Sequence, residues 1–255
     1  MTDSTMPGAR RFLRGLGRTV LAIIVVLVLL VVGFLFYANM VMRGEREYAI
    51  KAWTNPAVSI TSTDHSIVMT PTGTASGDGL VFIPGAKVDP YAYMFKLSGI
   101  VETAGVTVVI TKPTLNLAFF DTRPLSTFTA DAPGVDSWFI GGHSLGGVRS
   151  CMLADDPDVA GLVLFGSYCA NDLSATELEV LSIGGSEDGL STPQKIADAS
   201  SLLPATATFV QVEGLNHAGF GNYGVQSGDG VVTITSAEAR DEITAALVGF
   251  FDAPR

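Results

Sequence analysis

An uncharged apolar run near the start of the chain most constrains what this sequence can fold into. Val20 to Ala38 is nineteen residues long, reads VLAIIVVLVLLVVGFLFYA and contains no charged side chain. A helix of that length spans about 28 Å, close to the hydrocarbon thickness of a bilayer. A buried core helix would carry a polar face, and a cleaved signal peptide would end in a small-x-small site; the run has neither. We therefore expect a retained transmembrane anchor over residues 19–42.

The charges that flank this run predict its orientation. Four basic side chains precede it, and the two that follow it are mixed with acids: Arg10, Arg11, Arg14 and Arg18, then Arg43 and Arg46 with Glu45 and Glu47. The more basic flank stays in the cytoplasm. We expect a single-pass protein of the cell membrane with a basic cytoplasmic tail (1–18), a charged linker (43–56) and an extracytoplasmic folded domain (57–255).

The folded part of the chain is strongly acidic. Residues 44–255 carry ten Lys or Arg against 24 Asp or Glu, a formal charge near −14. Phosphate backbones and anionic lipid surfaces repel such a domain, so nucleic acid is excluded as a partner. The composition does not indicate an oligomeric state.

Short β-branched runs alternate with helical segments after residue 57. The strand candidates are Val58 to Thr61, Ser66 to Thr70, Leu80 to Ile83, Val106 to Thr111, Trp138 to Gly141, Ala160 to Phe165, Val180 to Ile183 and Thr208 to Val212. The helix candidates are Pro90 to Ala104, Leu145 to Ala154, Pro193 to Leu203 and Ala237 to Phe251. Continuous apolar strands between helices predict an α/β fold with a mostly parallel sheet, and the first two strands an antiparallel edge. Only about a dozen residues separate the strands near Phe165 and Val180, which predicts a site without a lid domain.

The pentapeptide Gly142-His143-Ser144-Leu145-Gly146 is the main chemical signal. It follows the apolar strand SWFIG and opens a helix, which is the context of a nucleophile elbow. The flanking glycines allow the strained turn that presents the serine. We expect Ser144 to be a nucleophile; the alternative is an ordinary helix-capping serine.

A serine hydroxyl needs a base, and the chain has three histidines. His143 adjoins Ser144 but should point away from it and serve packing, and His65 lies in an early hairpin that should be solvated. His217 follows a late strand, in the loop GLNHAGFG, where a base can lie over the carboxyl edge of the sheet. We therefore expect His217 to be the base, with a satisfied loop histidine as the alternative.

The acid that orients the base is expected to be Asp188, which lies in GGSEDGL directly after a strand. Glu187 is its neighbour, and Asp172, after the preceding strand, is the alternative acid. An Asp-Gly step also suits a simple tight turn. The chain order Ser144, Asp188, His217 is the order found in α/β-hydrolases.

An oxyanion hole needs two backbone N–H groups, which we expect from Leu145 and from Ala86 in the loop PGAKVDP. Lys87 either adds positive charge there or extends into solvent. The residues indicate no metal and no organic cofactor. Cys151 and Cys169 match no metal-site spacing and either pair, as an oxidising compartment would allow, or are small buried side chains.

Four stretches resemble α/β-hydrolases, and more narrowly a bacterial membrane-anchored group similar to small esterases and dienelactone-hydrolase-like proteins. They are FIPGAKVDPYAY, IGGHSLGG, LSIGGSEDG and LNHAGFGNYGVQSGDG. The resemblance implies an eight-stranded sheet, an acyl-enzyme mechanism and carboxylic-ester-like substrates. The chain departs from lipases, which have a His-Gly pair where Pro84-Gly85 stands, and from dienelactone hydrolases, which have a cysteine where Ser144 stands. We expect the segment Asn222 to Gly230 to be a rigid loop that braces His217.

These observations together predict a serine hydrolase that cleaves small-molecule or lipid-like esters. The same triad would also serve a thioesterase or a peptidase. A pseudo-hydrolase that acts as an anchored binding module is the alternative from a different class. Substrate identity is left open by the sequence.

Overall fold

The computed structural model describes the backbone of residues 7–253 and the side chains from Phe12 onward. The chain divides into two compact units, Met1–Met40 and Val41–Arg255. The first contains one helix, α1 (Pro7–Ala38). Its span Phe12–Ala38 has a mean hydropathy of 3.3 over the best window and is long and apolar enough to cross a membrane. The basic tail expected over residues 1–18 lies partly outside the described residues, which begin at Pro7. From Pro7 onward this segment is part of α1.

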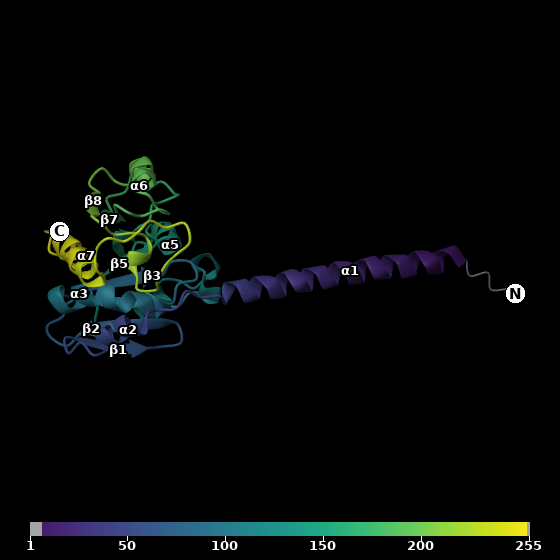
Figure 1. Cartoon of the computed structure of the whole chain (residues 1–255), viewed down its shortest axis with the longest axis horizontal. Coiled ribbons are helices and arrows are strands. Elements are labelled where there is room, and N and C mark those ends of the chain that lie inside the picture. The colour runs from purple at the N-terminus through teal and green to yellow at the C-terminus, as the bar shows by residue number, and fades with distance from the viewer. Residues whose placement is uncertain (1–6, 254–255) are drawn as a thin grey trace. The chain divides into compact units, whose positions relative to one another are not determined.

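The second unit is built on one sheet (Figure 1). Its strands are β1 (Val58–Ser62), β2 (Ser66–Pro71), β3 (Asp78–Ile83), β4 (Thr107–Thr111), β5 (Ser137–His143), β6 (Val159–Phe165), β7 (Glu179–Gly185) and β8 (Thr208–Val212). They lie in the order β1-β2-β4-β3-β5-β6-β7-β8. The strand β2 is antiparallel to β1 and β4, and the remaining pairs are parallel. The predicted antiparallel edge and mostly parallel sheet are both confirmed.

Helices and short 3₁₀ turns connect the strands. The α-helices of this unit are α2 (Arg46–Trp53), α3 (Met94–Ala104), α4 (Ser126–Thr129), α5 (Leu145–Leu153), α6 (Pro193–Ala199) and α7 (Ser236–Phe251). The 3₁₀ turns are η1 (Pro90–Tyr93), η2 (Thr114–Asn116), η3 (Ala118–Phe120), η4 (Ser200–Leu202) and η5 (Ala218–Phe220). The helix expected from Pro90 therefore begins as a 3₁₀ turn, which Asp89 caps by accepting the Tyr91 N–H at 3.0 Å.

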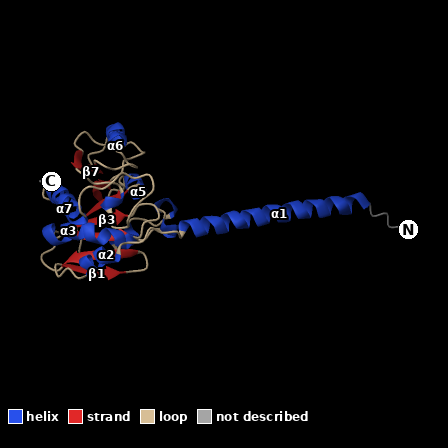
Figure 2. Cartoon of the chain, in the orientation of Figure 1, coloured by secondary structure: helices blue, strands red, loops and turns tan. Residues whose placement is uncertain are grey.

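The central strands are apolar throughout because both of their faces are covered. In β3, Leu80 and Phe82 belong to the core that contains residues of α3 and α7, whereas Val81 and Ile83 belong to the core that contains Cys151 of α5. Successive side chains of a strand point to opposite faces, so this division separates the two layers. Figure 2 shows the strands in red between these helices. The edge strand β1, by contrast, is largely exposed.

The segment 43–56, expected to be a linker, is instead part of the folded unit. It contains α2, which packs against α3. Ala52 is buried in the core, and Ala49, one helical turn earlier, packs on the same core. Met42 pairs with Val88, since the Met42 N–H donates to the Lys87 carbonyl at 2.7 Å. Small apolar side chains at helical spacing explain why this charged stretch docks on the domain.

Cys151 and Cys169, whose pairing the sequence left open, form a disulfide with their Cα atoms 5.6 Å apart. Cys151 lies in α5, and Cys169 lies four residues after the end of β6. The two segments are neighbours because the Ser144 N–H, just before α5, donates to the Phe165 carbonyl at 3.1 Å. The bridge therefore ties the helix that follows Ser144 to the loop that follows β6.

Candidate active site

The expected site residues all follow the carboxyl ends of parallel strands. Ala86 follows β3, Ser144 follows β5, Asp188 follows β7 and His217 follows β8. These ends meet at one edge of the sheet, where ligands bind in open α/β proteins. The folding of the sheet thus gathers residues that are up to 131 positions apart at a single rim.

Ser144 occupies a strained turn between β5 and α5. Its φ is 53° and its ψ is −124°, a region that non-glycine residues rarely adopt. The neighbouring backbone is close: a Cβ at Gly142 would lie 2.5 Å from the Gly146 carbonyl carbon and 2.7 Å from the Ile83 oxygen. Glycine is therefore required for this turn. Such strain costs about 1–3 kcal/mol and is characteristic of functional sites, as in a nucleophile elbow.

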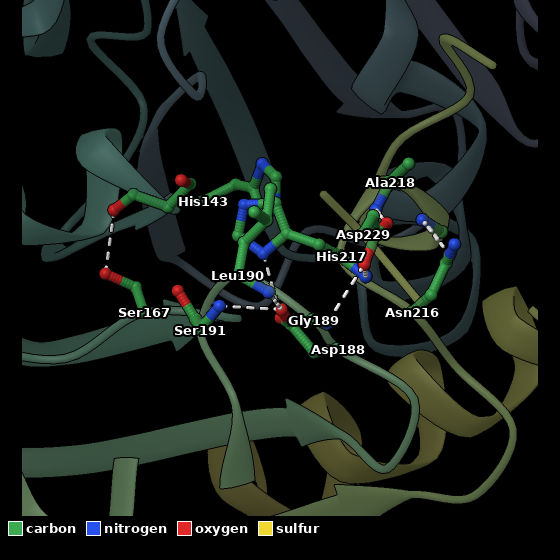
Figure 3. Close-up of polar contacts among 12 residues, drawn as sticks. His143, Ser167, Asp188, Gly189, Leu190, Ser191, Asn216, His217, Ala218 and Asp229 are labelled. Atoms are coloured by element: carbon green, nitrogen blue, oxygen red, sulfur yellow. Dashed lines mark hydrogen bonds and ion pairs between the residues drawn. The ribbon is translucent and has the colours of Figure 1, made fainter. Parts of the chain in front are cut away.

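Asp188 is buried and holds His217 through one carboxylate oxygen (Figure 3). Its Oδ2 lies 2.8 Å from His217 Nδ1. Its Oδ1 accepts the backbone N–H groups of Leu190 at 2.8 Å and Ser191 at 2.7 Å. The carboxylate is thus fixed in its own turn and orients the imidazole.

The two other acids considered from the sequence lie at the surface. Asp172 is exposed and accepts the Ser174 N–H in a local turn. Glu187 is also exposed, although it adjoins Asp188. Neither is hydrogen-bonded to His217 in the described part of the chain.

His217 presents its second ring nitrogen without a partner. The side chain is 1% exposed, and Nε2 has no hydrogen-bond partner among the described residues. With Nδ1 held by Asp188, Nε2 is the nitrogen that remains for proton transfer.

Two sets of contacts link the residues around Ser144 to the Asp188–His217 pair. Ser167 Oγ donates to the Ser144 carbonyl at 2.7 Å, and a Cβ at Gly166 would lie 2.9 Å from Asp188 Oδ2. The ring of His143, which precedes Ser144, lies 4.4 Å from the His217 ring, centroid to centroid. The described residues show no direct hydrogen bond between Ser144 Oγ and His217 Nε2, and such bonds often form only when substrate is bound.

Tyr93 supports the site in a way that sequence reasoning missed, and it does so through His143, which was expected to serve packing. The Tyr93 hydroxyl accepts the Gly85 N–H at 3.0 Å and lies 2.9 Å from His143 Nδ1. Burial raises the pKa of Tyr93, while burial and the nearby His217 hold the pKa of His143 well below its usual value. A neutral His143 therefore packs on His217 and is tied to the loop after β3. His65, expected to be solvated, is only partly exposed and lies 3.0 Å from Asp131.

The two backbone N–H groups expected in the oxyanion hole belong to Ala86, in the loop after β3, and to Leu145, at the start of α5. The Ala86 and Leu145 N–H groups have no hydrogen-bond acceptor within the described residues. The Gly85 N–H is already bonded to Tyr93, and the Lys87 N–H to the Asn116 carbonyl at 2.7 Å. Lys87 has a φ of 57°, so this loop is also strained. Unpaired N–H groups at Ala86 and Leu145 suit an oxyanion hole.

The site has no lid and no metal-binding cluster in the part of the chain that is described. Residues 166–178, between β6 and β7, contain no helix. No group of three or more His, Cys, Asp or Glu side chains is placed to hold a metal ion among those residues.

A sequence model described as the alpha/beta hydrolase family matches residues 79–241, which is more than half of the chain. The chain belongs to the alpha/beta hydrolase family. Strands β4 to β8, all but the first residue of β3, the elbow and the loops of Asp188 and His217 lie within the matched part of this hydrolase. A search among curated proteins found no match to its sequence.

Solved structures similar to this hydrolase confirm the fold. The carboxylesterase CesB from Bacillus subtilis is 11% identical, with a TM-score of 0.55 over 87% of this chain and 98% of that one. A serine hydrolase without a lid from Xanthomonas campestris is 13% identical, with a TM-score of 0.53 over 79% and 98%. A bacterial membrane phospholipase A is 16% identical, with a TM-score of 0.52 over 96% and 100%. The predicted α/β-hydrolase fold is thereby confirmed.

Proposed function

We propose that this hydrolase cleaves carboxylic esters with Ser144 as nucleophile, His217 as base and Asp188 as orienting acid. The observation that carries the proposal is the buried His217, whose Nδ1 is bonded to Asp188 while its Nε2 has no partner among the described residues. The strained Ser144 follows β5, whose carboxyl end lies at the same edge of the sheet as the ends of β7 and β8. Acyl transfer needs a nucleophile, a base and an acid that orients the base.

The reaction then proceeds in two stages. Ser144 Oγ attacks the ester carbonyl as its proton passes to His217 Nε2, and the Ala86 and Leu145 N–H groups bind the oxyanion. The leaving alkoxide takes that proton from His217, which leaves an acyl ester on Ser144. In the second stage water attacks this ester while His217 takes its proton. Ser144 Oγ then leaves with that proton, and the carboxylic acid is released.

The names of similar proteins favour esters over other acyl compounds. A carboxylesterase and a membrane phospholipase A, which share the fold, both act on carboxylic esters. A thioesterase or peptidase would use the same triad, so the leaving group has to be tested directly. A binding module without catalysis is disfavoured by the intact Ser144, Asp188 and His217.

We further propose that α1 anchors the enzyme in the cell membrane with the catalytic unit outside the cytoplasm. The uncharged span and the excess of arginine before it support this orientation. The disulfide between Cys151 and Cys169 is in keeping with an oxidising compartment.

Hydrolysis of p-nitrophenyl esters of graded acyl length by the full chain in detergent tests the function, with matched thioesters and anilides alongside. We expect ester turnover that falls by about four orders of magnitude or more in Ser144→Ala. Ser174→Ala, at an exposed serine, is the matched control and should keep full turnover. Activity retained in Ser144→Ala, or faster cleavage of anilides than of esters, would contradict the proposal.

A further inference from the structure

Asp229 joins the two loops that carry the proposed acid and base. Its Oδ1 accepts the Gly189 N–H at 3.1 Å and the His217 N–H at 3.0 Å, and its Oδ2 accepts the Ala218 N–H at 2.8 Å (Figure 3). Gly189 directly follows Asp188, and Ala218 directly follows His217. A single carboxylate therefore bonds to the turn after β7 and to the loop after β8.

The backbone around Asp229 lies against the acid turn with no room for side chains. A Cβ at Gly189 would lie 2.7 Å from the Gly228 carbonyl oxygen and 2.8 Å from the Gly230 nitrogen. A Cβ at Gly230 would overlap the Glu187 carbonyl oxygen. The sequence Gly228-Asp229-Gly230 thus permits the close approach that lets the carboxylate reach both loops.

A second link runs from the histidine loop to the same segment. Asn216 Nδ2 donates to the Gly230 carbonyl at 2.8 Å, and Asn216 Oδ1 accepts the Gly219 N–H at 2.9 Å. The histidine loop is therefore held to this segment on both sides of His217. Hydrogen bonds to a carboxylate are stronger than neutral ones, so Asp229 is the stronger of the two links.

We propose that Asp229 is a positioning residue that keeps His217 at hydrogen-bonding distance from Asp188; this inference rests on the proposed function. Asp188 and His217 follow different strands, so their 2.8 Å bond depends on the relative position of two separate loops. Asp229 contacts no reacting atom and acts through the backbone of its neighbours. A misplacement of about 1 Å costs on the order of 100-fold in rate.

The isosteric change Asp229→Asn tests the proposal in the full chain in detergent with p-nitrophenyl acetate. The amide nitrogen is a donor, so it leaves at least one of the backbone N–H groups without an acceptor. We expect kcat to fall about 10- to 100-fold while KM changes by less than about twofold. Asp229→Glu, which keeps the charge, should recover part of the loss.

Asp156→Asn is the matched control. Asp156 also accepts a backbone N–H, that of Asp158 at 3.0 Å, but it precedes β6 at the opposite edge of the sheet. This variant should keep the wild-type kcat and KM.

The combination Asp188→Asn/Asp229→Asn separates positioning from general stability. If Asp229 acts through the Asp188–His217 pair, the double variant is about as slow as Asp188→Asn alone. Effects that multiply, or an unchanged kcat in Asp229→Asn alone, would overturn the inference. Loss of activity in Ser144→Ala alongside either result would leave the proposed function intact.

Proton NMR of the resting enzyme tests the inference even if the variants are too slow for a turnover assay. The Nδ1 proton of His217, bonded to Asp188, should give a strongly deshielded proton resonance in the resting enzyme. We expect this resonance to shift or broaden in Asp229→Asn and to be unchanged in Asp156→Asn. An identical resonance in all three proteins would also overturn the inference.

Discussion

At the scale of single residues, the two oxygens of Asp188 have separate tasks. Oδ1 is held by two backbone N–H groups of its own turn, and Oδ2 is held by His217. The side chain therefore cannot turn away without losing three hydrogen bonds in a buried place. This arrangement selects the His217 tautomer with its proton on Nδ1 and leaves Nε2 able to accept one.

Asp188→Asn is expected to lower kcat by about four orders of magnitude, because an amide favours the wrong imidazole tautomer. Circular dichroism should show an unchanged fold, since the amide oxygen can still accept from the Leu190 and Ser191 N–H groups. Steady-state ester hydrolysis measures the effect, with exposed Asp172→Asn as the control. Near-normal turnover in Asp188→Asn would show that another acid orients His217.

The sequence predicts the reacting side chains better than it predicts the residues that hold them in place through distant contacts. Asp188 and His217 could be proposed because each stands in a recognisable loop after a strand. The roles of Tyr93 and Asp229 could not be proposed. The role of Tyr93 depends on a contact with His143, 50 positions away, and that of Asp229 depends on backbone donors that every residue carries. The sequence predicted a rigid loop over Asn222 to Gly230 that braces His217, without indicating which side chain holds it.

At the scale of elements, α3 and α7 are joined by a buried lysine. Lys96 is 1% exposed, and its Nζ donates to the Ser236 carbonyl at 2.9 Å at the start of α7. Burial lowers its pKa to about 7, against the attraction of Glu45 and with a further contribution from Arg240. A lysine that loses its proton near neutral pH makes the packing of these helices sensitive to pH.

Lys96 predicts that stability rises with pH above neutrality. In the unfolded chain the side chain keeps its proton to about pH 10, whereas in the folded chain it loses it near pH 7. The unfolded state then binds more protons between these values, so the free energy of unfolding increases with pH in that window. Relative to Lys96→Met, wild type should gain on the order of 1 kcal/mol per unit between pH 7 and 9. Urea denaturation measures this, and a flat or falling difference would contradict it.

The disulfide is expected to stabilise the elbow helix against unfolding. Cys151 and Cys169 are 18 positions apart, and closing a loop of that size contributes about 3 kcal/mol. The variant Cys151→Ala/Cys169→Ala should lose a comparable amount in urea denaturation, and a reducing agent should lower the stability of wild type alone. Equal midpoints for the two proteins under oxidising conditions would exclude a bridge in solution.

Sequence patterns were sufficient to predict most strands and helices but not α2. The eight strands and four main helices were predicted within a few residues, and the central strands gave the clearest pattern because their apolar runs are buried on both faces. The helix α2 was missed because it has only eight residues, three of them charged, and only Ala49 and Ala52 pack on the core. The docking of a short helix depends on the surface that receives it, which the sequence of the helix does not contain.

At the scale of the whole molecule, the apolar helix and the acidic catalytic unit call for different surroundings. No residue in the most apolar part of the span Phe12–Ala38 is buried. Exposed apolar surface of that extent is stable only in a membrane or against another apolar surface. The acidic unit, in contrast, is suited to water.

The full chain is therefore expected to stay in the membrane fraction after alkaline carbonate extraction, with its N-terminal residues still present. A chain that begins at Val41 should be released into the soluble fraction with the same activity toward soluble esters. Immunoblotting and N-terminal sequencing check both statements. A mature protein that lacks residues 1–38 would show that the helix is a cleaved signal and not an anchor.

The most direct test of the account is fluorophosphonate labelling of the full chain, followed by peptide mapping. We expect one covalent adduct, located on Ser144, that disappears in Ser144→Ala and forms far more slowly in His217→Ala. An adduct on another residue, or labelling that persists in Ser144→Ala, would contradict the catalytic role assigned to this rim of the sheet.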